Sequence, residues 1–148
     1  MTDFEGKTMY CRSTEEKILN AWKDRKNKKI SIRDSVKIGA DDSIRYRLWN
    51  TDLVIKFKND DNIYINISSN QEEIDRYCSG WNYARRDYII SNTTKSRLNA
   101  FLYYYGFHGL EVHSSVKDWS VKYDGEELEV DSLYKLDFIN KRLVKVEQ

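Results

Sequence analysis

Three consecutive β-strands are predicted by the stretch SIRYRLWNTDLVIKFKNDDNIYINI, residues 43–67. Apolar and polar side chains alternate in its first run, residues 43–50, and again in its last run, residues 63–67. A period of two is typical of strands with one buried face and one solvent face. Asn and Asp residues at 59–62 form a turn signal that separates the second run, residues 53–58, from the third. Because the links are short, we expect an antiparallel meander.

The strongest helical pattern follows in residues 93–105. Its apolar residues occupy positions i, i+3, i+4 and i+7, which line one face of a helix. Thr93 is a favourable N-cap, and Gly106 is a favourable C-terminal stop. We therefore expect one well-defined helix packed on the meander. Its apolar residues are Leu98, Phe101, Leu102 and Tyr105.

Weaker elements are expected on both sides of this core. A charged helix over residues 14–28 has a narrow apolar stripe and should pack lightly on the body of the domain. Residues 30–38 read as a strand whose alternation breaks at Asp34. Near the C-terminus, Asp124-Gly125 and Asn140-Lys141 are expected to turn two hairpins.

The predicted fold class is α+β. It is an antiparallel β-meander packed by one main helix, with a weaker N-terminal helix and C-terminal β-hairpins. We expect residues 1–148 to form a single domain, because this length is typical of one domain and no linker interrupts it. Residues 1–29 are interpreted as an N-terminal extension and residues 69–91 as an insertion-like segment.

The composition is that of an intracellular globular protein. Of the residues, 40% are hydrophobic and 33% are charged. Two cysteines, Cys11 and Cys78, make no disulfide framework. The sequence contains neither a secretory leader pattern nor a run approaching the roughly 18 apolar residues that a membrane span needs. These features predict a cytoplasmic location and no membrane partner.

The net charge of +1 creates no global attraction to DNA or to anionic lipid. The charge is nevertheless uneven, since residues 1–60 carry a net +4 and residues 101–148 a net −3. Such asymmetry indicates a polar surface that binds a partner protein. Self-association of the chain is an open alternative.

No set of side chains predicts catalysis or metal binding. His108 and His113 lack a Cys or a further His at ligand spacing. Adjacent residues on a strand point to opposite faces, so His113 and Ser114 cannot form a triad with nearby Asp118. There is also no glycine-rich phosphate loop. We expect no enzyme activity, cofactor or metal, because several catalytic roles would have to converge and none do.

Three segments are rich in cations, and two of them also contain aromatic residues, a combination that neutralises phosphates and stacks on bases. They are the basic run at residues 23–29, the solvent face of the strand at residues 43–50, and residues 81–86. For each segment alone, a solvated charged surface is the competing interpretation, and the near-neutral net charge favours it. The candidate residues are Lys23, Arg25, Lys26, Lys28, Lys29, Arg45, Arg47, Trp49, Trp81, Tyr83, Arg85 and Arg86.

The face of the main helix opposite its apolar stripe is a candidate protein-docking surface. Tyr and Arg are enriched at interface hot spots, and the small residues Ser96 and Ala100 would leave room around them. The competing interpretation is that a second layer covers this face, for example the N-terminal helix through Trp22. The candidate docking residues are Arg97, Tyr103 and Tyr104.

The segment TTKSRLN, residues 93–99, resembles a helix start in a widespread family of small tailed-phage and prophage proteins of unassigned function. In that family, an Asn-Thr strand, a second strand and a Gly-Trp pair precede the helix, and a strand ending in Trp-x-Val follows it. In the family the Gly-Trp pair lies almost against Thr-Thr, whereas residues 82–92 separate them here. The resemblance implies a phage or prophage origin and a meander with a helix, and it assigns no residue role. The matching pieces here are Asn50-Thr51, residues 63–67, Gly80-Trp81 and Trp119-Ser120-Val121.

Three functions are consistent with these observations. The leading hypothesis is a phage accessory protein that inhibits a host defence machine handling nucleic acid, such as a CRISPR nuclease, by stoichiometric binding in the infected bacterial cytoplasm. The second is a single-stranded nucleic-acid binding protein. The third is a sponge that sequesters a signalling nucleotide by stacking its base on aromatic side chains.

Overall fold

The computed structural model describes residues 13–70, 72, 90–107, 110–115 and 119–147. Within these residues the chain forms two helices and ten strands. The elements are α1 (Ser13–Lys23), β1 (Lys28–Lys29), β2 (Asp34–Ile38), β3 (Ile44–Leu48), β4 (Thr51–Lys56), β5 (Tyr64–Asn66), α3 (Asn92–Tyr104), β6 (Val112–Ser115), β7 (Ser120–Tyr123), β8 (Glu126–Leu128), β9 (Leu133–Asp137) and β10 (Arg142–Lys145).

The predicted α+β meander is confirmed. Seven antiparallel strands pair in the order β1-β2-β3-β4-β5-β9-β10, so the first five follow the chain. The β9–β10 hairpin extends this sheet beside β5, whereas β6, β7 and β8 form a separate three-stranded sheet. Asp124 and Gly125 turn the β7–β8 hairpin with positive φ angles of 51° and 82°. Lys141, at φ 55°, lies in the turn of the β9–β10 hairpin.

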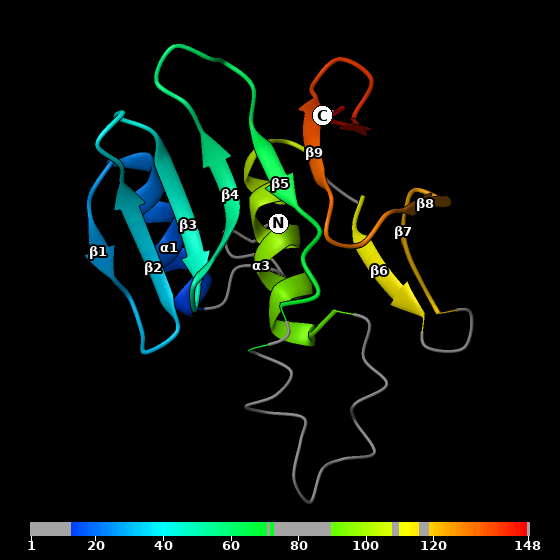
Figure 1. The fold of residues 1–148 in the computed structure, drawn as a ribbon, viewed down its shortest axis with the longest axis horizontal. Helices are drawn as coiled ribbons and strands as arrows, with labels where there is room; N and C mark the ends of the chain where they lie inside the picture. Colours follow the sequence, from blue (N-terminus) through cyan, green and yellow to red (C-terminus); the bar gives the residue numbers. More distant parts are fainter. Residues whose placement is uncertain (1–12, 71, 73–89, 108–109, 116–118, 148) are drawn as a thin grey trace, which may run out of the picture.

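Both helices lie on the same side of the seven-stranded sheet (Figure 1). The alternation in β3 explains why, because Ile44, Tyr46 and Leu48 are all buried while the arginines between them are only half-buried. The Phe101 ring of α3 packs against Tyr46 at 5.6 Å between centroids and against Trp22 of α1 at 4.9 Å. The core therefore lies between the helices and the sheet, and the other face of β2 and β3 carries half-buried or exposed polar side chains.

The main helix begins two residues earlier than the apolar spacing indicates, with Ser91 rather than Thr93 as its N-cap. The Ser91 hydroxyl accepts a hydrogen bond from the Thr94 backbone N–H at 3.0 Å, and this bond satisfies one of the free N–H groups at the helix start. At the other end, Gly106 has φ 89°, a conformation that favours glycine after a helix. The predicted stop is therefore confirmed.

The expectation that the N-terminal helix packs lightly is wrong. Ile18, Leu19 and Trp22 are at most 7% exposed, and Glu15 is 1% exposed. The helix also ends at Lys23 rather than near residue 28, because Lys28 and Lys29 leave it to pair with β2 as a short edge strand. The last two residues of the basic run therefore form a strand and not a continuation of the helix.

The predicted strand over residues 30–38 begins at Asp34 instead. The Asp34 carbonyl accepts hydrogen bonds from the backbone N–H groups of Ile30 and Ser31, which close a tight turn between β1 and β2. The break in alternation at Asp34 thus marks the start of the strand.

A wider arc of α3 is buried than its apolar stripe predicts. Ala100 is 1% exposed and Arg97 6% exposed, because α1 covers the side of α3 that was expected to face solvent. On another side, the Asn99 side chain exchanges two hydrogen bonds with the backbone of Val112 in β6, at 2.7 and 3.1 Å. The main helix is therefore enclosed by the large sheet, α1 and the small sheet.

Candidate nucleic-acid interface

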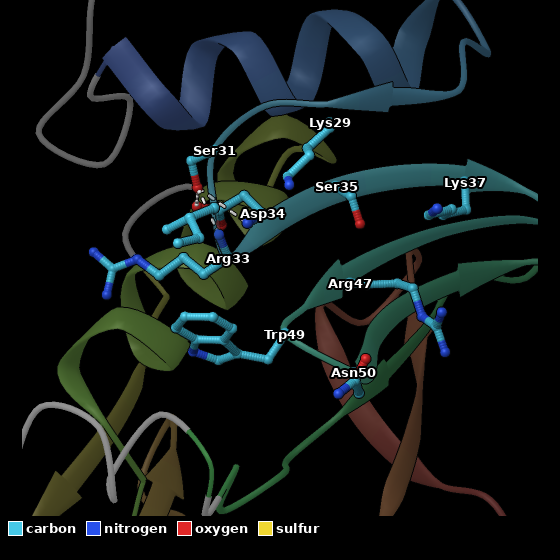
Figure 2. A pocket seen from close by; sticks show the side chains of 10 residues that line it. Lys29, Ser31, Arg33, Asp34, Ser35, Lys37, Arg47, Trp49 and Asn50 are labelled. Atoms are coloured by element: carbon cyan, nitrogen blue, oxygen red, sulfur yellow. Dashed lines mark hydrogen bonds between the residues drawn. The ribbon is translucent and has the colours of Figure 1, made fainter.

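A groove of about 260 Å³ opens beside β1, β2 and β3 (Figure 2). Four cationic side chains line it, together with an indole ring and small polar groups. We call it the basic groove. Its lining residues are Lys29, Ser31, Ile32, Arg33, Asp34, Ser35, Lys37, Arg47, Trp49 and Asn50.

Strand register explains why cations from distant parts of the sequence meet here. Lys29 pairs with Ser35, and Ser35 pairs with Arg47, so the three lie in one row across β1, β2 and β3. Side chains directly opposite one another lie on the same face of a sheet. The small Ser35 side chain between two long cationic ones leaves a hollow. Lys37, two residues along β2, extends the same face.

The charges of the groove are only partly compensated. The Asp52 carboxylate accepts from Arg47 Nε at 2.7 Å and from Arg45 Nη1 at 2.9 Å, so one acid serves two guanidinium groups. This shared acid confirms that Arg45 and Arg47 lie on one face. Within the described part of the chain, neither Lys29 nor Lys37 forms an ion pair. The groove therefore has a positive potential that would attract an anion.

Trp49 occupies the groove in a conformation that is costly for a large side chain. It is the first residue of the two-residue turn between β3 and β4, and its φ is 57°. Glycine is the usual residue where a hairpin requires positive φ at this position. The backbone N–H of Trp49 donates a hydrogen bond to the backbone carbonyl of Arg33 at 2.7 Å, and this bond holds the turn. The indole lies beyond the strand end, beside the Arg33 side chain (Figure 2).

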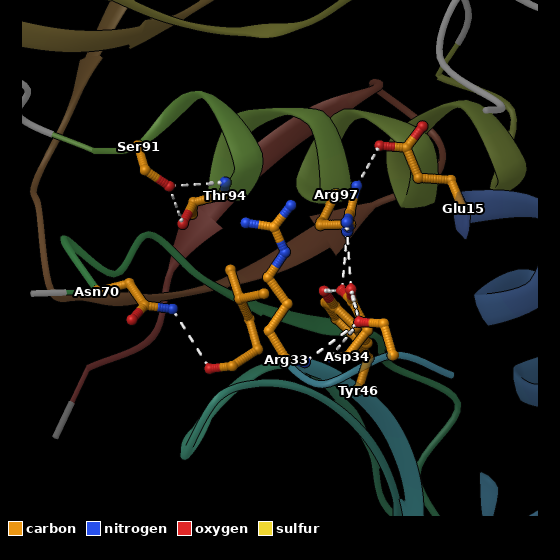
Figure 3. A network of polar contacts seen from close by, with 10 residues as sticks. Glu15, Arg33, Asp34, Tyr46, Asn70, Ser91, Thr94 and Arg97 are labelled. Carbon is orange, nitrogen blue, oxygen red and sulfur yellow. Dashed lines mark hydrogen bonds and ion pairs between the residues drawn. The ribbon is translucent and has the colours of Figure 1, made fainter. Parts of the chain in front are cut away.

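Figure 3 shows a buried ionic network around Asp34 and Arg97. Arg97 of α3 contacts Glu15 of α1 at 2.9 Å and both carboxylate oxygens of Asp34 at 2.9 and 3.2 Å. The Tyr46 hydroxyl donates to Asp34 at 2.5 Å, and the Ser31 hydroxyl donates to the same carboxylate at 2.7 Å. The network joins α1, β2, β3 and α3, and Asp34 belongs both to it and to the groove lining.

Ionisation inside the network follows from its contacts. Burial raises the pKa of the Asp34 carboxyl, but the hydrogen bonds and charge of Arg97 outweigh burial and hold that pKa below its usual value. Burial, reinforced by the Asp34 charge, raises the pKa of Tyr46 well above its ordinary value. Asp34 is therefore ionised and Tyr46 neutral at pH 7.

The assignment of Arg97 to an exposed docking surface is wrong. The guanidinium is used inside the molecule, because α1 packs over α3 and supplies Glu15 as a partner. Of the other helix candidates, Tyr104 is 41% exposed and Tyr103 is half-buried. Tyr104 therefore remains available at the surface.

The three cation-rich segments contribute unequally to the groove. Arg47 and Trp49 line it, and Lys29 joins them from the basic run. Arg45 turns to Asp52 and does not line it. Four members of the run are exposed but lie outside the lining, and four candidates lie outside the described residues. The first four are Lys23, Arg25, Lys26 and Lys28, and the second four are Trp81, Tyr83, Arg85 and Arg86.

Two cations of the groove were missed by sequence reasoning. Lys37 carries a usable signal, since it alternates with buried Val36 and so faces the same way as Ser35. Arg33 has no such sequence signal, because it lies in the turn before β2 and is not part of an alternating strand. A second cavity of about 200 Å³ near the start of α3 also has Arg33 in its lining, together with Thr93 and Ser96. Arg33 thus lies where the two hollows approach each other.

Comparison with known proteins adds no identification: no family model, curated protein or solved structure matches this chain. Among the described residues, no group of three or more His, Cys, Asp or Glu side chains is placed to hold a metal ion. The helices in that part of the chain are all too short or too polar to cross a membrane.

Proposed function

We propose that this protein binds single-stranded nucleic acid stoichiometrically in the basic groove, without catalysing a reaction. The observation that supports this most is Trp49, held at positive φ among four cationic side chains. A backbone outlier at a bulky residue costs on the order of 1 kcal/mol or more, and such outliers cluster at functional sites. One part of the indole packs against the hydrophobic core, and the part that remains exposed is the surface we propose for stacking.

The chemistry of the lining matches that of a strand with unpaired bases. An indole can stack on a base only when the base is not enclosed in a duplex, and each stacked base contributes about 1–3 kcal/mol. Lys29 and Lys37 supply cations that no described carboxylate neutralises, and Arg33 and Arg47 supply guanidinium groups that can bind phosphate with two hydrogen bonds. Two or three phosphates contacted in this way predict a slope of log affinity against log salt concentration of about −1.4 to −2.1, at roughly 0.7 per phosphate of a single strand.

Fluorescence anisotropy with a labelled oligothymidylate, measured between 50 and 200 mM salt, tests this function. We expect binding with the slope given above, and we expect Lys37→Glu to weaken binding at least tenfold and to reduce the slope. Lys122→Glu is the matched control, because Lys122 is also an exposed strand lysine but belongs to the small sheet. Absence of binding at 50 mM salt, or equal losses in both variants, would refute the proposal.

The aromatic contribution is tested separately. Trp49→Ala should weaken binding by about 1–3 kcal/mol with little change in salt slope, since stacking is not electrostatic. Trp49→Phe should restore part of the loss. If a free mononucleotide displaced the oligonucleotide as well as a longer strand does, the nucleotide-sponge function would be favoured instead.

We also propose, as a second candidate, that the chain inhibits a host defence machine that handles nucleic acid. A specific observation favours it: Tyr104, Phe138 and Ile139 expose apolar surface that could dock a protein while the groove competes for the machine's nucleic acid. The resemblance to tailed-phage proteins supports this reading. Addition of the protein to a purified defence nuclease tests it, with dose-dependent loss of cleavage at one-to-one ratio as the expected result and unchanged cleavage at excess protein as the contrary one.

A further inference from the structure

A cluster of aromatic rings reaches the surface where α3 ends beside the turn between β9 and β10. The Tyr105 ring lies 4.9 Å from Tyr104 and 5.9 Å from Phe138, measured between centroids, and Phe138 lies 5.8 Å from Phe107. Ile139 follows Phe138 in the turn. We call these five residues the aromatic patch.

The patch is anchored at its inner side and open at its outer side. Trp22 of α1 donates its indole N–H to the Tyr105 hydroxyl at 2.6 Å, and Phe107 is 1% exposed. The outer members are different: Ile139 is 90% exposed, Tyr104 41% and Phe138 37%. Grouped apolar exposure of this kind is typical of interaction sites, whereas single exposed residues need no explanation.

The turn that carries Phe138 and Ile139 is already held by hydrogen bonds in the unbound protein. Asp137 accepts hydrogen bonds from the backbone N–H groups of Ile139 and Asn140 at 3.1 and 3.2 Å, and from the Asn140 side chain at 3.0 Å. The hydrogen bonds from Asn140 are the main reason that the pKa of Asp137 falls to about 2. A hydrogen bond from Arg142 lowers this pKa further. A pre-organised turn reduces the ordering cost that a docking surface otherwise incurs on binding.

The charges around the patch indicate which partner fits. The Lys141 ammonium lies 5.1 Å from the Phe107 ring centroid and forms no ion pair with a described residue. Arg142 is paired with Asp137 at 3.2 Å, so these two charges balance. Of these three charges, only that of Lys141 is left unbalanced, so one cation lies beside the aromatic patch. A twofold contact between two copies would bring the two Lys141 side chains together, which disfavours self-association through this face.

We propose that the aromatic patch docks an acidic, amphipathic segment of a partner protein. Apolar side chains of that segment pack on Ile139, Phe138 and Tyr104, and a carboxylate next to them pairs with Lys141. This docking is separate from the basic groove and does not depend on nucleic-acid binding.

Two synthetic peptides provide the test. The first is a 15-residue helix of Leu, Glu and Ala with Leu at helical spacing, and the second replaces every Glu with Lys. In amide-correlation NMR spectra of the full chain, we expect the acidic peptide to shift the signals of Tyr104, Ile139 and Lys141, and the basic peptide to leave them unchanged. Equal shifts with both peptides, or none with either, would overturn the proposal.

Variants separate docking from folding. Ile139→Asp should reduce the affinity for the acidic peptide at least tenfold, whereas the matched control Trp119→Asp, at an exposed apolar residue outside both the patch and the groove, should not. Lys141→Glu should shift the preference toward the basic peptide. If the same signals moved with protein concentration in the absence of peptide, a second copy of the chain would be the occupant and the proposal would be wrong.

Discussion

Replacing Arg97 with methionine would leave two carboxylates in the core without their cation. Arg97 is 6% exposed, Glu15 and Asp34 are each 1% exposed, and the guanidinium contacts both acids. Breaking a buried pair by removing one partner typically costs 3–5 kcal/mol, because the remaining charge has neither solvent nor a counterion. Methionine keeps much of the side-chain length, so cavity formation adds little.

Urea denaturation at pH 7 measures this loss directly. For a chain of this length, about 2–4 °C of Tm accompanies each kcal/mol, so the Tm should also fall by roughly 10 °C. Arg97→Lys keeps the charge but loses the two-pronged contact with Asp34, and we expect a smaller loss of about 1–3 kcal/mol. This variant keeps the prediction testable if Arg97→Met does not fold.

The pH dependence gives a second, independent check. Because the pKa of Asp34 is lowered in the folded protein, its contribution to stability is present above the unfolded pKa near 3.9 and is lost as the pH falls through the folded pKa. Without Arg97, burial would instead raise that pKa. The gap in unfolding free energy between wild type and Arg97→Met should therefore narrow as the pH falls, starting at the raised pKa of Asp34 in the variant and continuing below the unfolded pKa near 3.9. A gap under 1 kcal/mol at pH 7, or one that widens in acid, would refute the reasoning.

Further predictions concern single groups of the fold. Tyr46→Phe removes a hydrogen bond to buried, ionised Asp34 and should cost about 1.5–3 kcal/mol in the same urea titration; a loss below 0.5 kcal/mol would contradict it. Ser91→Ala removes the N-cap of α3 and should cost about 1 kcal/mol with some loss of helical circular dichroism, more than Thr93→Ala does. Gly125→Ala places a Cβ where no atom lies within 4 Å but φ is 82°, so a loss of about 1 kcal/mol would come from the backbone alone, and an unchanged stability would argue against that conformation.

The parts of the fold that sequence could predict are those with a local signal. Alternation from Ile44 to Leu48 reports one buried face directly, and the spacing of Leu98, Phe101 and Leu102 reports a helix. The turn at Asp124-Gly125 has its own residue chemistry. These local signals do not reveal how many other elements pack over each face of a helix or sheet. The mostly polar pattern of α1 therefore predicts a peripheral helix, although its narrow apolar stripe is buried.

The candidate site depends on register, which a periodic pattern does not determine. Lys29, Ser35 and Arg47 meet only because three strands pair at particular offsets, and a shift of one residue would send these side chains to the other face. Arg97 illustrates the converse difficulty. An arginine beside an apolar stripe looks like surface, and its acids lie 63 and 82 positions away in sequence.

Those long separations have a consequence for how the molecule is made. The ionic network closes loops of 63 and 82 residues, so it must form after much of the chain has been ordered and is expected to slow folding relative to a protein of local contacts. During synthesis, Asp34 and Glu15 emerge long before Arg97, the cation that pairs with both of them. A truncated chain that stops before α3 should therefore remain unfolded, however complete its first five strands are.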